Sequence, residues 1–206
     1  MPQAAPYNRD EALDAAMSLF WKKGYHATSL KDLEASLNMK PGSIYSAFSS
    51  KSNLYLLALE RYFESSKQSF LDIASTPGSP LDALLNQMRI FAALPPDHEH
   101  AQSCMLVKTL IDTRSTDTEI AERAKLYVSD LCEIIATIFD QAINLGELPR
   151  DTDTRRLARR YQASIMALRF KTHQGFQRTQ ITELAEDFVQ EFERLRCMPP
   201  PSTPRL

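Results

Sequence analysis

The chain has 206 residues, 43% of them hydrophobic, and a net charge of −2 at pH 7. The apolar content is sufficient for a packed core, and the near-neutral charge argues against non-specific coating of nucleic acid or of an anionic membrane. No apolar run is long enough to cross a bilayer, and the N-terminus lacks the basic-then-apolar order of a secretion signal. We therefore expect a soluble, cytoplasmic protein without membrane contact.

The first expected helix runs from about residue 8 to residue 23. Asn8 is a suitable N-cap, and Gly24 suits the left-handed conformation that commonly ends a helix. One face carries Ala12, Ala16, Leu19 and Phe20, which predicts that this face packs inward. Trp21 could stack on a base or fill the core, and the need for a large filler favours packing.

A second helix is expected over residues 30–37, followed by a tight turn. Ser29 and Asp32 form a capping-box pattern at its start. Its apolar face carries Leu30, Leu33 and Leu37. Asn38 tolerates the left-handed backbone that a sharp turn between helices requires. This segment therefore predicts the first half of a two-helix motif.

The second half of the motif is a short helix over residues 41–48. Pro41 can begin it, because a first-turn N–H has no helical partner to lose. Ile44 and Phe48 lie four apart and should face inward, while Lys40 and Lys51 flank the helix without an acidic residue between them. Two helices joined in this way form a helix-turn-helix unit, whose second helix lies in the DNA major groove.

This stretch resembles the DNA-binding signature of the TetR family of repressors. The resemblance is carried by the spacing of Gly24-Tyr25, Thr28-Ser29, Asp32-Leu33, Gly42-Ser43-Ile44-Tyr45, Phe48 and Ser50-Lys51-Ser52-Asn53-Leu54. It implies DNA contacts by Thr28, Ser29, Lys40, Pro41, Gly42, Ser43, Tyr45, Ser46 and Lys51. The Lys40-Pro41 order and Ala47, where family members often have His, depart from the usual pattern, so the operator sequence is not carried over.

The remainder of the chain also shows a helical period. A long helix is expected over residues 51–75, and the segment TPGSP at 76–80 ends it. Further helices are expected over residues 81–94 and 101–112, from a capping box at Thr116 and Glu119 to residue 145, from Asp153 or Thr154 onward, and over 179–196.

The sequence thus predicts an all-α protein. Residues 1–50 form a three-helix helix-turn-helix domain and residues 51–75 a connecting helix. Residues 81–197 form a helical ligand-binding and dimerisation domain, and residues 198–206 a disordered tail.

Apolar stripes on the last two helices allow two interpretations. They can pack into the core of one chain, or they can form a four-helix interface in a homodimer. The family resemblance favours a dimer. A dimer is also expected independently, because one short recognition helix makes too few base contacts for useful specificity. The interface residues expected are Leu157, Ile165, Leu184, Phe188 and Phe192.

The resemblance also implies a pocket for a small-molecule inducer in the second half of the chain. Around it we expect Phe91, Cys104, Met105, Tyr127, Tyr161, Met166, Arg169 and His173, each of which could instead be ordinary core or surface. Arg169 lies among apolar neighbours and could hold a carboxylate in bidentate fashion, or form a surface ion pair.

Cys104 admits a further hypothesis. The segment from Ser103 to Val107, together with Gly146 to Pro149 and the string from Met39 to Phe48, resembles the TetR subgroup that includes regulators answering to reactive electrophiles and small unsaturated acids. A thiol near a helix N-terminus could react with an electrophile, although an inert thiol is the alternative. His98 and His100 could join Cys104 as metal ligands, but a solvated loop is the default, and neither a metal site nor a cofactor is expected.

The function that follows is a ligand-responsive repressor. A homodimer would bind a palindromic double-stranded DNA operator and be released by a small-molecule inducer, such as a carboxylate or an electrophile. The alternative is a thiol- or metal-responsive helical sensor built on Cys104 with His98 and His100. An enzyme is not expected, because no nucleophile-base set or phosphate loop is present.

Overall fold

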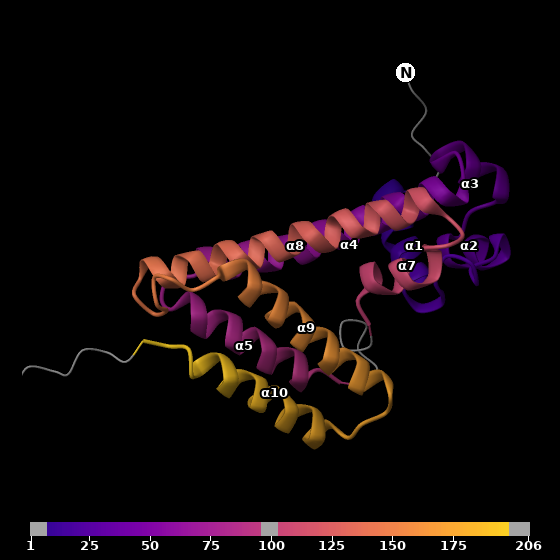
Figure 1. Cartoon of the computed structure of the whole chain (residues 1–206). Helices are drawn as coiled ribbons and strands as arrows, with labels where there is room; N and C mark the ends of the chain where they lie inside the picture. The colour runs from indigo at the N-terminus through magenta and orange to yellow at the C-terminus, as the bar shows by residue number, and fades with distance from the viewer. Residues whose placement is uncertain (1–7, 96–102, 198–206) are drawn as a thin grey trace, which may run out of the picture. The chain divides into compact units, whose positions relative to one another are not determined.

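A computed structural model of the chain describes residues 8–95 and 103–197 (Figure 1). All regular structure in these two ranges is helical, which confirms the predicted fold class. The helices are α1 (Arg9–Lys23), α2 (Leu30–Leu37), α3 (Pro41–Phe48), α4 (Lys51–Ser75), α5 (Pro80–Ala93), α7 (Met105–Thr113), α8 (Thr118–Asn144), α9 (Thr154–His173) and α10 (Arg178–Glu193). None of these helices is long and apolar enough to span a bilayer.

Most helices begin at the capping residues that the sequence indicates. The Asn8 carboxamide oxygen accepts a hydrogen bond from the Asp10 N–H at 3.0 Å, and Ser50 Oγ accepts one from the Asn53 N–H at 3.0 Å. Asp153 caps α9 in the same way. Each cap satisfies an N–H group that has no partner within the first turn, so the helix starts are fixed locally.

The start of α8 differs from the prediction. Thr116 was expected to cap this helix, but its hydroxyl donates to the Asp112 carbonyl at 3.3 Å. The cap is Asp117, whose carboxylate accepts from the Ile120 N–H at 3.1 Å. A charged oxygen is the stronger acceptor for a helix N–H, and it also favours the positive end of the helix dipole.

The chain divides into two compact units. Among the described residues, unit 1 comprises 8–68 and 103–131, and unit 2 comprises 69–95 and 132–197. The division falls within α4 and within α8. It differs from the predicted domains, because residues 103–131, assigned by sequence to the second domain, pack with the N-terminal helices.

Unit 1 is organised around α1, α2, α3 and the first part of α4. The buried side chains of these helices include Ala16, Phe20, Leu33, Ile44, Phe48, Leu54 and Ala58. Trp21 is also buried, with its ring edge-on to Tyr62 at 4.8 Å, so the prediction that it packs is confirmed. Arg61 of α4 binds Asp14 of α1 through two N–H groups, which adds a charged contact at the edge of this core.

Helix α7 belongs to the same unit and contacts the end of α1. Trp21 Nε1 donates to the Ser103 carbonyl at 2.8 Å, and Lys108 Nζ donates to the carbonyl of Lys22 at 2.9 Å. Gly24 ends α1 with φ of +84°, and a Cβ at this position would lie 2.9 Å from a carboxylate oxygen of Asp112. Glycine is therefore favoured here by its backbone conformation, while a Cβ would require the Asp112 carboxylate, the end of a flexible side chain, to shift.

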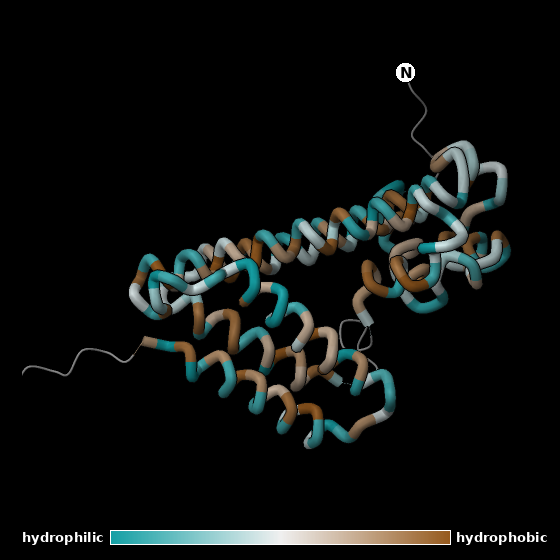
Figure 2. The backbone as a smooth tube through the Cα atoms, in the orientation of Figure 1, coloured by the Kyte–Doolittle hydropathy of each residue, from teal (hydrophilic) through white to brown (hydrophobic). Residues whose placement is uncertain are grey.

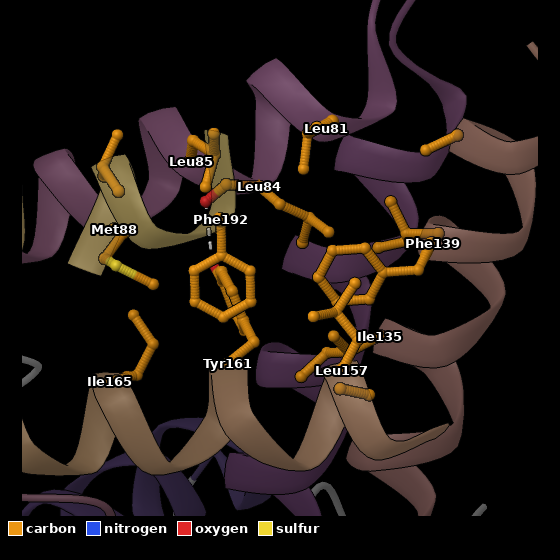
Figure 3. Close-up of a cluster of buried hydrophobic side chains, with 14 of the residues drawn as sticks. Leu81, Leu84, Leu85, Met88, Ile135, Phe139, Leu157, Tyr161, Ile165 and Phe192 are labelled. Carbon is orange, nitrogen blue, oxygen red and sulfur yellow. Dashed lines mark hydrogen bonds between the residues drawn. The ribbon is translucent and has the colours of Figure 1, made fainter. Parts of the chain in front are cut away.

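Unit 2 contains α5, α9, α10 and the later part of α8. Hydrophobic and hydrophilic residues alternate along α9 and α10 in a pattern that repeats with the helical turn (Figure 2). The apolar faces meet in one cluster whose members include Leu84, Met88, Phe139, Tyr161 and Phe192 (Figure 3). The Tyr161 hydroxyl donates to the Leu84 carbonyl at 2.8 Å, so its polar atom is satisfied inside the core.

Three residues predicted at a dimer interface lie in this cluster. Leu157, Ile165 and Phe192 are 4%, 7% and 1% exposed, and Phe192 packs parallel to Phe139. Their side chains are thus occupied within their own unit, and their contact with a second copy stays a prediction. Leu184 and Phe188 pack against the same cluster but are only partly buried.

The loop after α8 joins three segments of unit 2. The Glu147 carboxylate accepts from the Leu81 N–H at 3.1 Å, at the start of α5. Its carbonyl accepts from the Cys197 N–H at 2.8 Å, beyond the end of α10. Arg196 adds hydrogen bonds to the carboxylates of Asp82 and Glu193. The end of the described chain is therefore fixed to the start of α5.

Candidate nucleic-acid interface

The first helix of the predicted motif, α2, is fixed by its capping box. Ser29 Oγ accepts from the Asp32 N–H at 3.2 Å, and the Asp32 carboxylate accepts from the Ser29 N–H at 2.8 Å. Lys23 of α1 lies 2.6 Å from the same carboxylate. This ammonium, with the hydrogen bonds from Ser29, holds the pKa of Asp32 well below its usual range. α2 is thereby anchored to the end of α1.

The turn to α3 has the backbone that its sequence predicts. Asn38 is left-handed, with φ of 51° and ψ of 43°, and Lys40 and Pro41 begin the next helix. Ile44 and Phe48 are 2% and 1% exposed, so the helix is held against the unit 1 core by its inner face. The opposite face is consequently fixed in orientation.

The predicted DNA-contacting residues differ in exposure. Tyr45 is 46% exposed, Ser29, Lys40, Gly42 and Ser46 are exposed, and Pro41, Ser43 and Lys51 are partly buried. A Cβ at Gly42 would meet no atom within 4 Å, which leaves the backbone open to close approach. These residues give α3 a small, polar outer surface.

Thr28 is the exception. It is 1% exposed, and its hydroxyl donates to the Gly24 carbonyl at 2.7 Å. The side chain is thus occupied within the turn before α2. A polar side chain next to a capping serine can satisfy its hydroxyl on its own backbone instead of facing outward, so a DNA contact by Thr28 stays a prediction.

A γ-turn connects α3 directly to α4. Ser49 has φ of 66° and ψ of −50°, and the Ser50 N–H donates to the Phe48 carbonyl at 2.7 Å. The same carbonyl accepts from the Asn53 carboxamide at 2.9 Å. This backbone conformation is strained for a residue other than glycine, at about 1–3 kcal/mol. It places the first turn of α4 immediately after the polar helix.

The surroundings of Lys51 are not predictable from the local sequence. Its ammonium lies over the Tyr25 ring, 4.7 Å from the ring centroid. Partial burial lowers the pKa of Lys51, and the Asp32 carboxylate opposes that change. No local pattern signals the contact, because the two residues are separated by α2 and α3.

The predicted pocket residues are divided between the two units. Cys104, Met105 and Tyr127 belong to unit 1, where Met105 is buried and Tyr127 stacks on Phe63 with ring centroids 4.2 Å apart. Cys104 is the N-cap residue of α7 and is partly buried, but its side chain makes no capping hydrogen bond.

The other five predicted pocket residues belong to unit 2. Tyr161 is wholly buried and part of the core, whereas His173 is exposed at the end of α9. Met166 is partly buried. The Arg169 guanidinium lies over the Phe91 ring, 4.8 Å from its centroid. Within this unit, the structure thus brings together Phe91 and Arg169.

A surface cavity of about 480 Å³ in unit 2 contains none of the predicted pocket residues. It is lined by polar residues of α8 and the start of α9, including Glu133, Asp140 and Arg155. Arg155 Nε donates to the Glu133 carboxylate at 3.0 Å, so opposite charges are paired at its wall.

The metal hypothesis falls partly outside the described residues. His98 and His100 are not among them, and the described ranges contain no group of three or more His, Cys, Asp or Glu side chains that could hold a metal ion. Cys104, Cys132 and Cys197 all carry free thiols.

Comparison with known proteins assigns both halves of the chain. A family model described as bacterial regulatory proteins of the tetR family matches residues 12–58, and one described as a tetracyclin repressor-like C-terminal domain matches residues 80–183. The HTH-type transcriptional regulator YezE of Bacillus subtilis is 28% identical over 77% of this chain and 82% of its own length. The HTH-type transcriptional repressor KstR2 of Mycolicibacterium smegmatis is 30% identical over 66% of this chain and 68% of its own.

Solved structures agree on the fold. A cysteine-substituted variant of the TetR-family regulator CifR, in complex with 26-base-pair operator DNA, superposes with a TM-score of 0.81 at 22% identity, covering 92% of this chain and 98% of that one. The family models, the relatives and the helix-turn-helix geometry therefore agree. The chain belongs to the TetR family and is a DNA-binding transcriptional regulator rather than an enzyme.

Proposed function

We propose that the chain is a ligand-responsive repressor that binds a palindromic operator as a homodimer in the cytoplasm. The observation that carries this proposal is the outer face of α3, where Tyr45 and Ser46 are exposed while Ile44 and Phe48 are buried. A short helix held in this way can enter the major groove without rearrangement. The relative KstR2 is described as a repressor, and CifR was solved on operator DNA.

Dimerisation supplies the second recognition helix. Two α3 helices related by two-fold symmetry would contact half-sites about 34–36 Å apart, one turn of DNA. On α10, Leu184 and Phe188 are partly buried hydrophobic residues that the core of one chain does not cover completely. We assign them to the interface, where a second copy would remove the rest of their apolar surface from water.

The inducer site is assigned to unit 2, around Phe91, Met166 and Arg169. Met166 and Phe91 are partly buried, and the Arg169 guanidinium lies against the ring. A guanidinium next to apolar side chains can bind a carboxylate in bidentate fashion, so a small organic acid fits this arrangement. The ligand would need to favour the non-binding conformation by only a few kcal/mol to release the operator.

Fluorescence anisotropy with labelled DNA from the region next to the chain's own gene tests the repressor assignment. We expect tight binding to a palindrome at physiological salt and much weaker binding to the same fragment with scrambled half-sites. Equal affinity for both fragments would refute sequence-specific repression.

A thiol-responsive version of the same regulator is the second candidate. It is favoured by the position of Cys104, which is partly buried as the N-cap residue of α7 and makes no capping hydrogen bond. If this version is right, an electrophile such as a small unsaturated aldehyde releases DNA from the parent protein but not from Cys104→Ser. Equal release from both proteins would rule out sensing by this thiol.

A further inference from the structure

Lys51 is the first residue of α4, and its ammonium is held in one position in the protein without DNA. Lys51 follows the γ-turn at Ser49, and Ser50 caps the helix that it begins. The side chain is partly buried, and its ammonium lies 4.7 Å from the centre of the Tyr25 ring. A lysine at this position would otherwise sample many rotamers in water.

The Tyr25 ring is held in place by contacts with other aromatic rings. It meets the ring of Tyr55 edge-on, with centroids 5.0 Å apart, and the neighbouring His26 ring at 5.1 Å. Tyr55 is 2% exposed and shares a hydrogen bond of 2.7 Å with Thr109 of α7. The aromatic surface beneath Lys51 is therefore part of the packed unit and not a mobile loop side chain.

We propose that Tyr25 is a positioning residue for DNA binding, which holds the Lys51 ammonium where it meets a backbone phosphate. This inference rests on the proposed operator binding. An ammonium carries three N–H donors, and contact with a ring face leaves donors directed away from the ring. A side chain that is ordered in the free protein loses less rotamer freedom when it binds, so the ring raises affinity without touching DNA.

A double-mutant cycle tests this role. The probe is a duplex of random sequence at low salt, because a phosphate contact does not depend on base sequence. We expect Lys51→Ala to lower the slope of log affinity against log salt by about 0.9, the value for one phosphate contact. Tyr25→Leu should weaken binding roughly two- to five-fold, because the ring orders the free side chain with the strength of one cation–π contact at a partly exposed site, and that strength limits the gain in affinity.

The coupling between the Lys51 and Tyr25 substitutions in DNA affinity shows whether the ring acts through the ammonium. In a Lys51→Ala background, Tyr25→Leu should have almost no further effect, whereas independent losses that multiply would overturn the proposal. Tyr25→Phe keeps the ring face and should bind like the parent. If it loses as much as Tyr25→Leu, the hydroxyl and not the ring is responsible, and the proposal fails.

Two controls separate positioning from damage to the fold. Lys171→Ala removes a cation from a comparable pair in unit 2, where its ammonium lies 4.5 Å from the Phe176 ring centroid, and should leave the salt slope unchanged. In the free protein, proton NMR should show ring-current shifts of the Lys51 side chain that Tyr25→Leu abolishes and Tyr25→Phe retains. Absence of these shifts in the folded parent would refute the contact without any reference to DNA, and a parent that binds no duplex would instead refute the proposed function.

Discussion

Ile44 and Tyr45 are adjacent in the chain, but their substitutions should have opposite consequences. Ile44 is 2% exposed in the unit 1 core, and Tyr45 is 46% exposed on the outer face of α3. Truncating a buried isoleucine to alanine costs about 2–5 kcal/mol, through lost burial and the cavity that remains. Truncating the exposed tyrosine should change the free energy of unfolding by only about 0.5 kcal/mol.

Operator binding should be weakened more by Tyr45→Ala than by Ile44→Ala, the reverse of their effects on stability. If Tyr45 contacts the operator, Tyr45→Ala weakens binding by about 1–3 kcal/mol per half-site while the protein remains folded. Ile44→Ala should reduce binding only in proportion to the protein that it unfolds. Urea unfolding followed by circular dichroism gives the first quantity, and fluorescence anisotropy with operator DNA at a temperature where both variants are folded gives the second. A Tyr45→Ala protein destabilised as much as Ile44→Ala would refute the division between surface and core on which the interface rests.

Three further predictions concern the turn, the capping box and the dimer. Ser49→Gly should raise the free energy of unfolding by about 0.5–1 kcal/mol, because glycine removes the strain of the positive φ but is more flexible when unfolded; a urea midpoint equal to or below that of the parent would contradict the strain. Asp32→Asn should flatten the acid side of the stability profile: the folded-state pKa of Asp32 lies below the unfolded value of about 3.9, so its contribution is complete above that pH and is lost as the pH falls. An acid profile unchanged by Asp32→Asn would show that the cap contributes nothing. Leu184→Asp or Phe188→Asp should give monomers in analytical ultracentrifugation, and dimers of parental affinity would exclude α10 from the interface.

Local signals in the sequence identify most of the helix boundaries. Asn8, Ser29 with Asp32, Ser50 and Asp153 all cap the helices that they precede, because a capping hydrogen bond reaches only two or three residues along the chain. The error at Thr116 arises where two adjacent residues can both cap, and only the geometry shows that Asp117 is used.

Contacts between distant segments are less accessible to sequence reasoning. The spacing of Leu157, Ile165 and Phe192 correctly indicates that each side chain is buried, but periodicity cannot distinguish a partner helix in the same chain from one in a second copy. The contact between Tyr25 and Lys51 is unpredictable from sequence for the same reason. A ring and a cation 26 positions apart carry no pattern of their own, and only the fold of α2 and α3 brings them together.

The connection made by Glu147 bears on how this regulator can be recombined with others. Regulators that combine a DNA-binding domain with a ligand-binding domain can be recombined into chimeras, in which one segment is exchanged between proteins. Here a graft of a foreign segment from α10 to residue 197 would have to reproduce both the hydrogen bond from the Cys197 N–H to Glu147 and the pairing of Arg196 with Asp82 at the start of α5. An exchange that takes residues 80–197 as one block keeps these contacts, whereas one that replaces only residues 178–197 retains Asp82 and Glu147 but exchanges their donors.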